Sequence, residues 1–249
     1  MNDSIIAKCP FCGQDLIREG ELCNAKSVEH IIPYSLGNES LILGKGIICD
    51  KCNNYFALKI EKPFLELSPI KLLRSYHLIE SRKKNVPSMN VRCMDEVAPL
   101  KFDKKLNGFI LEMSPLTCMR LLRGEHPDLL LLDGIDIESL RNNEIVSKML
   151  AKIFMEIHLF YTIGYLQETG SDEPIYFKYD AKIKSLIEYV RFGKPNKICN
   201  YTVIRTREII PFNCNDDFIA RVELQLNKDN ELCGMLFKLY ELEFSFHLI

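Results

Sequence analysis

Four cysteines of the chain form two closely spaced pairs, Cys9/Cys12 and Cys49/Cys52, while the other cysteines stand alone. Each CxxC pair can fold into a tight turn that presents two sulfur atoms, and two such turns complete a tetrahedral zinc site with no open position. A redox role is the alternative for a lone CxxC, but redox chemistry does not need a matching second pair. The spacing therefore predicts a structural zinc ion.

The 36 residues between the two pairs (13–48) are more than the ~15–20 of a simple zinc ribbon. This insertion contains EHIIPYSLGN, and the second pair lies in CDKCNNYF. The ordered set of CxxC, EHxxP and CxxCN resembles the HNH (ββα-metal) endonuclease family, in the zinc-bound variety found in phage-type junction resolvases and bacterial defence nucleases. The resemblance covers about residues 5–60.

The resemblance implies a catalytic role for three residues. His30 would activate a water molecule, Glu29 and Asn53 would hold Mg²⁺ or Mn²⁺, and the zinc would keep strand and helix in register. The products would be DNA ends with 5′-phosphate and 3′-hydroxyl groups. The chemistry agrees, because an imidazole with a pKa near ~6.5 is a base at neutral pH, and carboxylate and amide oxygens suit a hard cation beside a phosphate.

Two positions depart from the family pattern. Many members carry Asp where this chain has Glu29, and the middle Asn of the motif has Asn38 as its nearest candidate, placed early. Two asparagines also have a second interpretation. Asn53 can cap the helix that begins after Cys52, which is compatible with ligation. Asn54 can contact phosphate or only solvent.

Charge is unevenly distributed along a chain whose formal net charge is −2. Residues 63–125 carry 11 basic and 7 acidic side chains, a net charge of +4, whereas residues 126–249 have a net charge of −5. The basic segment is the candidate surface for DNA, and its densest clusters are Arg82-Lys83-Lys84 and Lys101 with Lys104 and Lys105. The alternative is that these side chains are solvated loop residues.

The residue pattern predicts a mixture of helices and antiparallel strands. In the first 60 residues, Val28–Ile32 and Gly46–Cys49 are expected as strands, followed by a helix from Cys52. Pro63 suits the start of another helix, which Pro69 can split. Further on, we expect a hairpin over 98–112, a helix from Asn143 to about Gln167, a second helix from about Asp180 to Phe192, and an antiparallel sheet over the last 50 residues.

These observations predict an α+β protein with an HNH module at residues 1–62 and a C-terminal domain at residues 63–249. The C-terminal domain can grip DNA, form a homodimer or bind an activating partner protein. We expect a Mg²⁺- or Mn²⁺-dependent endonuclease, with bacterial antiviral defence as a setting. The alternative is a zinc-dependent module with weak catalysis that binds nucleic acid or protein, and RNA is a further possible substrate. A cytoplasmic location is expected, with no membrane association, because the N-terminus lacks a secretory signal and no run approaches the ~20 apolar residues of a membrane span.

Overall fold

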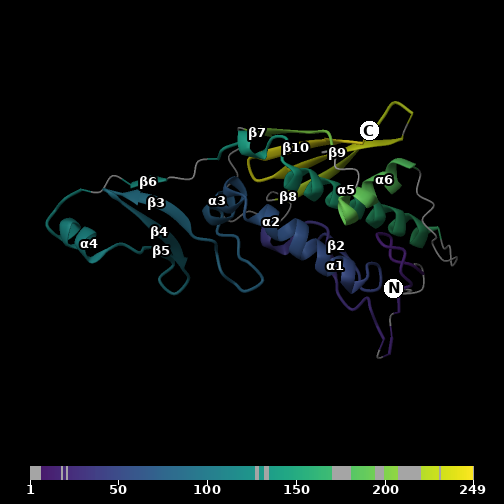
Figure 1. Ribbon diagram of the computed structural model, residues 1–249, viewed down its shortest axis with the longest axis horizontal. Helices are drawn as coiled ribbons and strands as arrows, with labels where there is room; N and C mark the ends of the chain where they lie inside the picture. The colour runs from purple at the N-terminus through teal and green to yellow at the C-terminus, as the bar shows by residue number, and fades with distance from the viewer. Residues whose placement is uncertain are drawn as a thin grey trace.

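The computed structural model describes most of the chain and has the predicted α+β architecture, with three antiparallel sheets among the described residues. Figure 1 shows a larger body, which contains both ends of the chain, and a smaller group of strands and one helix that projects from it. The described residues are 7–17, 19–20, 22–126, 129–131, 135–169, 181–193, 199–206, 220–229 and 231–248.

The N-terminal part of the body consists of two short strands followed by a helix. β1 (Glu29–His30) pairs antiparallel with β2 (Ile42–Leu43), and the 3₁₀ turn η1 (Tyr34–Leu36) lies between them. The helix runs from α1 (Asp50–Phe56) through a π-helical segment, η2 (Ala57–Glu61), into α2 (Lys62–Leu65).

The strand expected at Gly46–Cys49 is wrong, because β2 lies earlier in the chain. Gly46 has a positive φ of 82° and forms a turn, and Ile48 and Cys49 are buried in the loop that leads into α1. A short apolar run can be buried in a loop as well as in a strand, and periodicity does not separate the two. The predicted split at Pro69 is confirmed: Pro69 lies in the first turn of α3 (Ser68–Tyr76).

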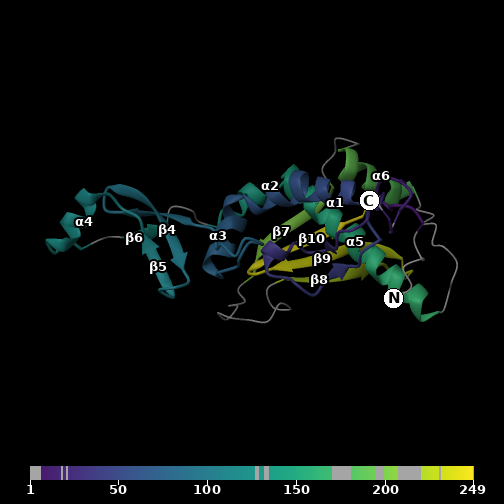
Figure 2. The same cartoon turned by 90° about the horizontal axis from the view of Figure 1, so that it is seen from below.

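Residues 89–131 form the projecting part, which we call the arm. It contains β3 (Met89–Cys93), β4 (Glu96–Asp103), β5 (Gly108–Leu111), α4 (Pro115–Leu122) and β6 (Leu129–Leu131), with the strand order β5-β4-β3-β6. The predicted hairpin over 98–112 is confirmed as β4 and β5. Figures 1 and 2 both show the arm standing apart from the body, and its buried residues Met89, Val91, Cys93 and Ala98 do not join the main hydrophobic core.

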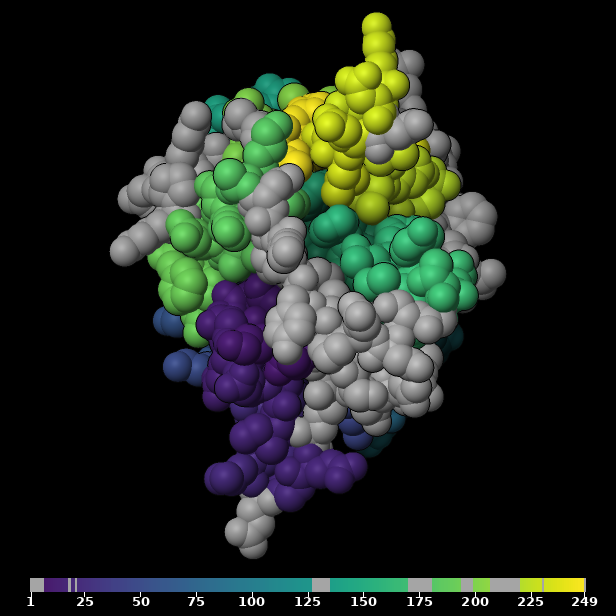
Figure 3. Space-filling model, turned by 90° about the vertical axis from the view of Figure 1, so that its right-hand side faces the viewer, coloured from purple at the N-terminus to yellow at the C-terminus, as the bar shows by residue number. Residues whose placement is uncertain are grey.

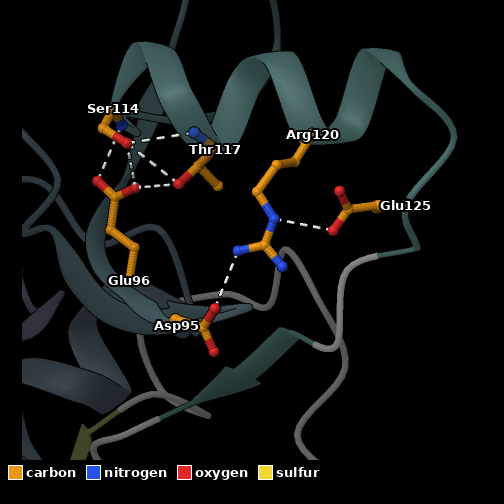
Figure 4. A network of polar contacts seen from close by, with 6 residues as sticks. All are labelled: Asp95, Glu96, Ser114, Thr117, Arg120 and Glu125. Atoms are coloured by element: carbon orange, nitrogen blue, oxygen red, sulfur yellow. Dashed lines mark hydrogen bonds and ion pairs between the residues drawn. The ribbon is translucent and has the colours of Figure 1, made fainter.

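Within the arm, a polar network holds helix α4 against strand β4 (Figure 4). The carboxylate of Glu96 accepts hydrogen bonds from the Ser114 amide and hydroxyl, each at 2.8 Å, and from the Thr117 hydroxyl at 2.5 Å. One turn further along α4, Arg120 pairs with Asp95 and Glu125. The start of α4 is therefore fixed to the beginning of β4.

The C-terminal part of the body combines two helices with a sheet. After the 3₁₀ turn η3 (Glu138–Leu140) come α5 (Glu144–Glu168) and α6 (Ala181–Phe192), close to the predicted limits; Asp180 lies outside the described residues. The sheet has the order β7-β10-β9-β8, from β7 (Tyr201–Arg205), β8 (Ala220–Leu226), β9 (Leu232–Leu239) and β10 (Leu242–His247). The antiparallel sheet is confirmed, with β7 as an additional strand.

One continuous hydrophobic core joins these parts of the body. It includes Phe11 and Phe56 from the N-terminal part, Phe154 on α5, and Phe244 and Phe246 on β10, all of them essentially inaccessible to solvent. Packing of both parts around α5 explains how an N-terminal segment of about 60 residues, too small for a sufficient core of its own, is stabilised.

Helix α5 is long and apolar enough, by length and composition alone, to cross a membrane. Most of its apolar stretch is buried inside the protein, and the helix carries the buried charged residues Lys152 and Glu156. These features are typical of the core helix of a folded domain.

Candidate active site

The four paired cysteines converge as predicted. The Sγ atoms of Cys9, Cys12, Cys49 and Cys52 all lie within 4.8 Å of one another, and those of Cys12 and Cys49 are 3.6 Å apart. Four thiolates at zinc–sulfur distances of about 2.3 Å in a tetrahedron place their sulfur atoms about 3.8 Å apart. The donor set and its spacing therefore fit a structural zinc ion.

The local backbone explains this convergence. In the first pair, the Gly13 amide donates to the Cys9 carbonyl at 2.8 Å, and Gly13 has a positive φ of 70° that glycine adopts without strain. In the second pair, the amides of Cys52 and Asn53 both donate to the Cys49 carbonyl at 3.0 Å as helix α1 begins. Each CxxC is thus a tight turn with its two sulfur atoms on one side.

The thiols affect one another electrostatically. A hydrogen bond from Cys52 lowers the pKa of Cys9 to about 5, the bond to Cys9 raises the pKa of Cys52, and burial raises the pKa of Cys49 to about 11. Ionisation of one sulfur thus opposes ionisation of its neighbours. A bound zinc ion supplies the positive charge that allows all four to ionise.

Helix α6 contacts this cluster from the C-terminal part of the chain. The Nε of Arg191 donates to the Cys52 sulfur at 3.3 Å, and its guanidinium lies over the Tyr55 ring at 4.3 Å. Figure 3 shows the N-terminal segment in purple directly beside α6 in green. Arg191 is therefore placed to offset the negative charge of a four-thiolate zinc site.

The predicted catalytic residues lie where β1 meets the start of α1. The side-chain amide of Asn53 donates to the carbonyl oxygen of Val28 at 3.3 Å, which joins the helix to the residue before Glu29. This contact uses the amide nitrogen, and no described residue occupies the amide oxygen of Asn53, which can bind another ligand. The structure thus brings Glu29, His30 and Asn53 into one region.

His30 has an environment suited to a neutral imidazole. Burial lowers its pKa below the ordinary value, and the positive charge of Arg82 lowers it further. Its Nδ1 atom is buried and has no hydrogen-bond partner within the described part of the chain. The ring lies edge-on to Tyr34, with the ring centres 6.0 Å apart. A neutral ring with an unused nitrogen can accept a proton.

Glu29 is buried in an ion cluster that the sequence did not predict. Lys152 on α5 is fully buried, and its ammonium lies 2.6 Å from Glu29, 2.9 Å from Glu61 and 2.9 Å from Glu156. The same ammonium donates to the His30 carbonyl oxygen at 3.1 Å. The carboxylate that the family pattern assigns to a metal is thus paired with a lysine in this structure.

The pKa values within the cluster follow from burial and charge. Burial alone would lower the pKa of Lys152, but attraction to Glu156, Glu29 and Glu61 outweighs it and raises the pKa well above its usual value. Burial raises the pKa of Glu156 well above its usual value against the opposing pull of Lys152, and burial raises the pKa of Glu29 in the same way. The cluster therefore favours the charged lysine, and burial shifts Glu156 toward its protonated form.

Two further asparagines were candidates for the site, Asn38 as the middle Asn of the family motif and Asn54 as a phosphate contact. Asn38 is buried, and its side-chain oxygen accepts from the Leu41 amide at 2.9 Å, so it braces the loop between β1 and β2. Asn54 is exposed on α1.

The loop from Ser35 to Leu36, just beyond β1, is braced from outside the N-terminal part. Arg74 on α3 donates to the Ser35 carbonyl at 2.6 Å, and the hydroxyl of Tyr240 donates to the Leu36 carbonyl at 3.1 Å. Both side chains are buried.

The basic clusters differ in their surroundings. Arg82, Lys83 and Lys84 are exposed, and Arg82 is close enough to His30 to influence its pKa. In the second cluster, Lys101 pairs with Glu112 at 2.6 Å and Lys104 pairs with Glu80. The first cluster is therefore the one placed near the candidate site.

A comparison with protein-family models identifies the N-terminal part. Residues 9–67 match the model described as HNH endonuclease. This segment belongs to the HNH endonuclease family. The match includes every cysteine of the zinc cluster, the β1 residues Glu29 and His30, and Asn53 at the start of α1. Comparisons with curated proteins and with solved structures gave no match.

The HNH module indicates a nuclease or nucleic-acid-binding function, and its cysteine cluster indicates structural zinc. Sequence reasoning missed three residues next to the module's site, namely Glu61, Lys152 and Arg191. A partial signal existed for Lys152 and Glu156, because two charged residues four apart interrupt the apolar stripe of a core helix. Their contact with β1 depends on tertiary packing, which the stripe does not predict.

Proposed function

We propose that the protein is a divalent-metal-dependent endonuclease that hydrolyses DNA phosphodiester bonds, with His30 as the general base. Glu29 and Asn53 are the proposed ligands of Mg²⁺ or Mn²⁺. The observation that supports this proposal most directly is the position of His30, a half-buried imidazole with a lowered pKa that lies where β1 meets the Asn53 side chain.

His30 would take a proton from the attacking water. Because burial and Arg82 both disfavour the charged imidazolium, the ring is ready to act as a base at neutral pH. A bound divalent cation would supply positive charge to the scissile phosphate and the leaving oxygen. Exposed Arg82, Lys83 and Lys84 would contact the DNA backbone near the site, with Asn54 as a further candidate contact on α1.

A second function is favoured by one observation. Because the ammonium of Lys152 lies 2.6 Å from Glu29, this carboxylate already has a cationic partner. An HNH module whose acidic residue pairs with a lysine and does not bind the divalent cation would bind nucleic acid or a partner protein without cutting. RNA in place of DNA would be a change of substrate within the first proposal.

A plasmid-nicking assay separates these functions. Wild type, His30→Ala and His126→Ala would be compared with Mg²⁺, Mn²⁺ or EDTA, after each protein is shown to hold about one zinc ion. His126 is exposed beyond α4 in the arm and is the matched control. We expect wild type and His126→Ala to nick DNA only with the metal, and His30→Ala to be inactive.

Other outcomes would change the conclusion. Zinc-loaded wild-type protein that binds DNA tightly without metal and never cuts it would favour the binding module. Preferential cutting of structured RNA would replace the DNA substrate. We also propose bacterial antiviral defence in the cytoplasm as the biological setting, because the chain resembles bacterial defence nucleases of this family. Equal phage plaque counts on hosts that express wild type and His30→Ala would contradict this setting.

A further inference from the structure

Lys152 connects the C-terminal part of the chain to the residues proposed for catalysis. It lies on α5, 122 positions after His30, and its side chain is fully buried between that helix and the HNH module. Glu29 and His30 lie on β1, Glu61 lies at the end of the π-helical segment η2, and Glu156 lies one turn further along α5.

All the N–H donors of the Lys152 ammonium have oxygen acceptors close by. It carries three N–H groups, and four oxygen atoms lie within 3.1 Å: one from each of three carboxylates and the carbonyl oxygen of His30. Three of those four oxygens belong to the HNH module. The lysine thus holds both the side chain of Glu29 and the main chain of the next residue.

Strand β1 is short. It has only two residues, paired with Ile42 and Leu43, and neighbouring strand residues point to opposite faces. Glu29 and His30 therefore diverge from a short strand, and both must be oriented within a narrow tolerance for catalysis. A buried cation that contacts both residues meets this need.

We propose that Lys152 is a positioning residue of the nuclease site, which holds the Glu29 carboxylate and the His30 main chain in the arrangement used with the divalent cation. This inference rests on the proposed nuclease function. Even when Glu156 is protonated, the carboxylates of Glu29 and Glu61 both face the one ammonium, so the lysine orients Glu29 without cancelling its attraction for a second cation. The C-terminal part of the chain is then a component of the active site.

The test compares full-length wild type, Lys152→Met and Lys148→Met. Methionine keeps the length of the side chain and removes its charge. Lys148 is the matched control, because it lies one turn earlier on α5 and pairs with Glu144 at the helix surface. Four quantities are measured on zinc-loaded protein: the Mn²⁺ affinity by electron paramagnetic resonance titration, kcat and KM for plasmid nicking, and the melting temperature.

We expect Lys152→Met to weaken Mn²⁺ binding and to lower kcat by about 10- to 100-fold each, as happens when groups behind metal ligands are removed. Lys148→Met should match wild type. A lower melting temperature with unchanged Mn²⁺ affinity and unchanged kcat would show a purely structural lysine and overturn the inference. Tighter Mn²⁺ binding in Lys152→Met would show that the lysine competes with the metal, and would also overturn it.

A second variant covers the case in which Lys152→Met does not fold. Lys152→Met with Glu156→Leu replaces the i, i+4 ion pair of α5 by an apolar pair, which buried helices tolerate. The same loss of Mn²⁺ affinity and kcat is expected. If neither variant folds and holds zinc, the role of the lysine is structural and the inference fails.

The two proposals fail in different ways. If wild type neither binds Mn²⁺ nor cuts DNA or RNA, the nuclease function fails, and the positioning role fails with it. If wild type binds Mn²⁺ and cuts while Lys152→Met does the same, only the positioning role fails.

Discussion

Removal of the Arg191 guanidinium should loosen the zinc site without unfolding the protein. In Arg191→Met the aliphatic stem can still pack on Tyr55, whereas the hydrogen bond from Nε to the Cys52 sulfur is lost. A hydrogen bond to a charged acceptor contributes about 1.5–3 kcal/mol. We use the lower limit, because the side chain is half-buried and the contact is 3.3 Å long.

About 1.5 kcal/mol corresponds to a roughly tenfold change in an equilibrium constant. Zinc-loaded wild type and Arg191→Met would therefore be titrated with a chromophoric chelator at pH 7, and the variant should lose its zinc at roughly one tenth of the chelator concentration. Lys184→Met is the matched control, because Lys184 is an exposed cation on the same helix. If Arg191→Met and Lys184→Met both retain zinc as wild type does, the sulfur contact contributes nothing to zinc binding and the reasoning is refuted.

Two further results are expected. The nicking rate should fall as the pH drops below about 6.5, through the lowered pKa of His30, because the imidazole must be neutral to act as a base. Arg82→Ala removes a charge that disfavours imidazolium, so the acidic limb of the kcat–pH profile should move to higher pH; an unmoved limb would contradict the role of Arg82. In the arm, Glu96→Gln loses a charged acceptor for the donors of Ser114 and Thr117, so amides in the first turn of α4 should exchange hydrogen faster, while those of α5 keep the wild-type rate. Equal exchange in α4 would show that the carboxylate does not fix that helix.

The sequence predicted the zinc cluster because its ligands come in short local pairs, whose geometry depends on a few neighbouring residues. Helix α5 was predictable because its apolar residues recur every three or four positions. Asn143 caps it, and the Asn143 side chain accepts hydrogen bonds from the amides of Ile145 and Val146. In contrast, the Gly46–Cys49 segment is apolar because Ile48 and Cys49 are buried in a loop. A buried loop and a buried strand both appear in the sequence as a short apolar run.

The surroundings of the site could not be predicted in this way. Lys152 meets Glu29 across 123 positions of sequence, and Arg191 meets Cys52 across 139. Such contacts depend on how α5 and α6 pack on the module. The EHxxP pattern likewise does not determine whether Glu29 holds a metal, because the pattern contains no information about Lys152 on α5.

The shared core has a consequence for how the protein is made. Cys9 to Cys52 leave the ribosome first and can capture zinc early, but Leu36 is held by Tyr240, and Phe56 belongs to the same core as Phe244 and Phe246. These partners are synthesised 188 to 204 residues later. During synthesis the early segment can therefore hold zinc and still lack the packing that surrounds β1. The arrangement of Glu29, His30 and Asn53 is therefore complete only after the C-terminal sheet has been made.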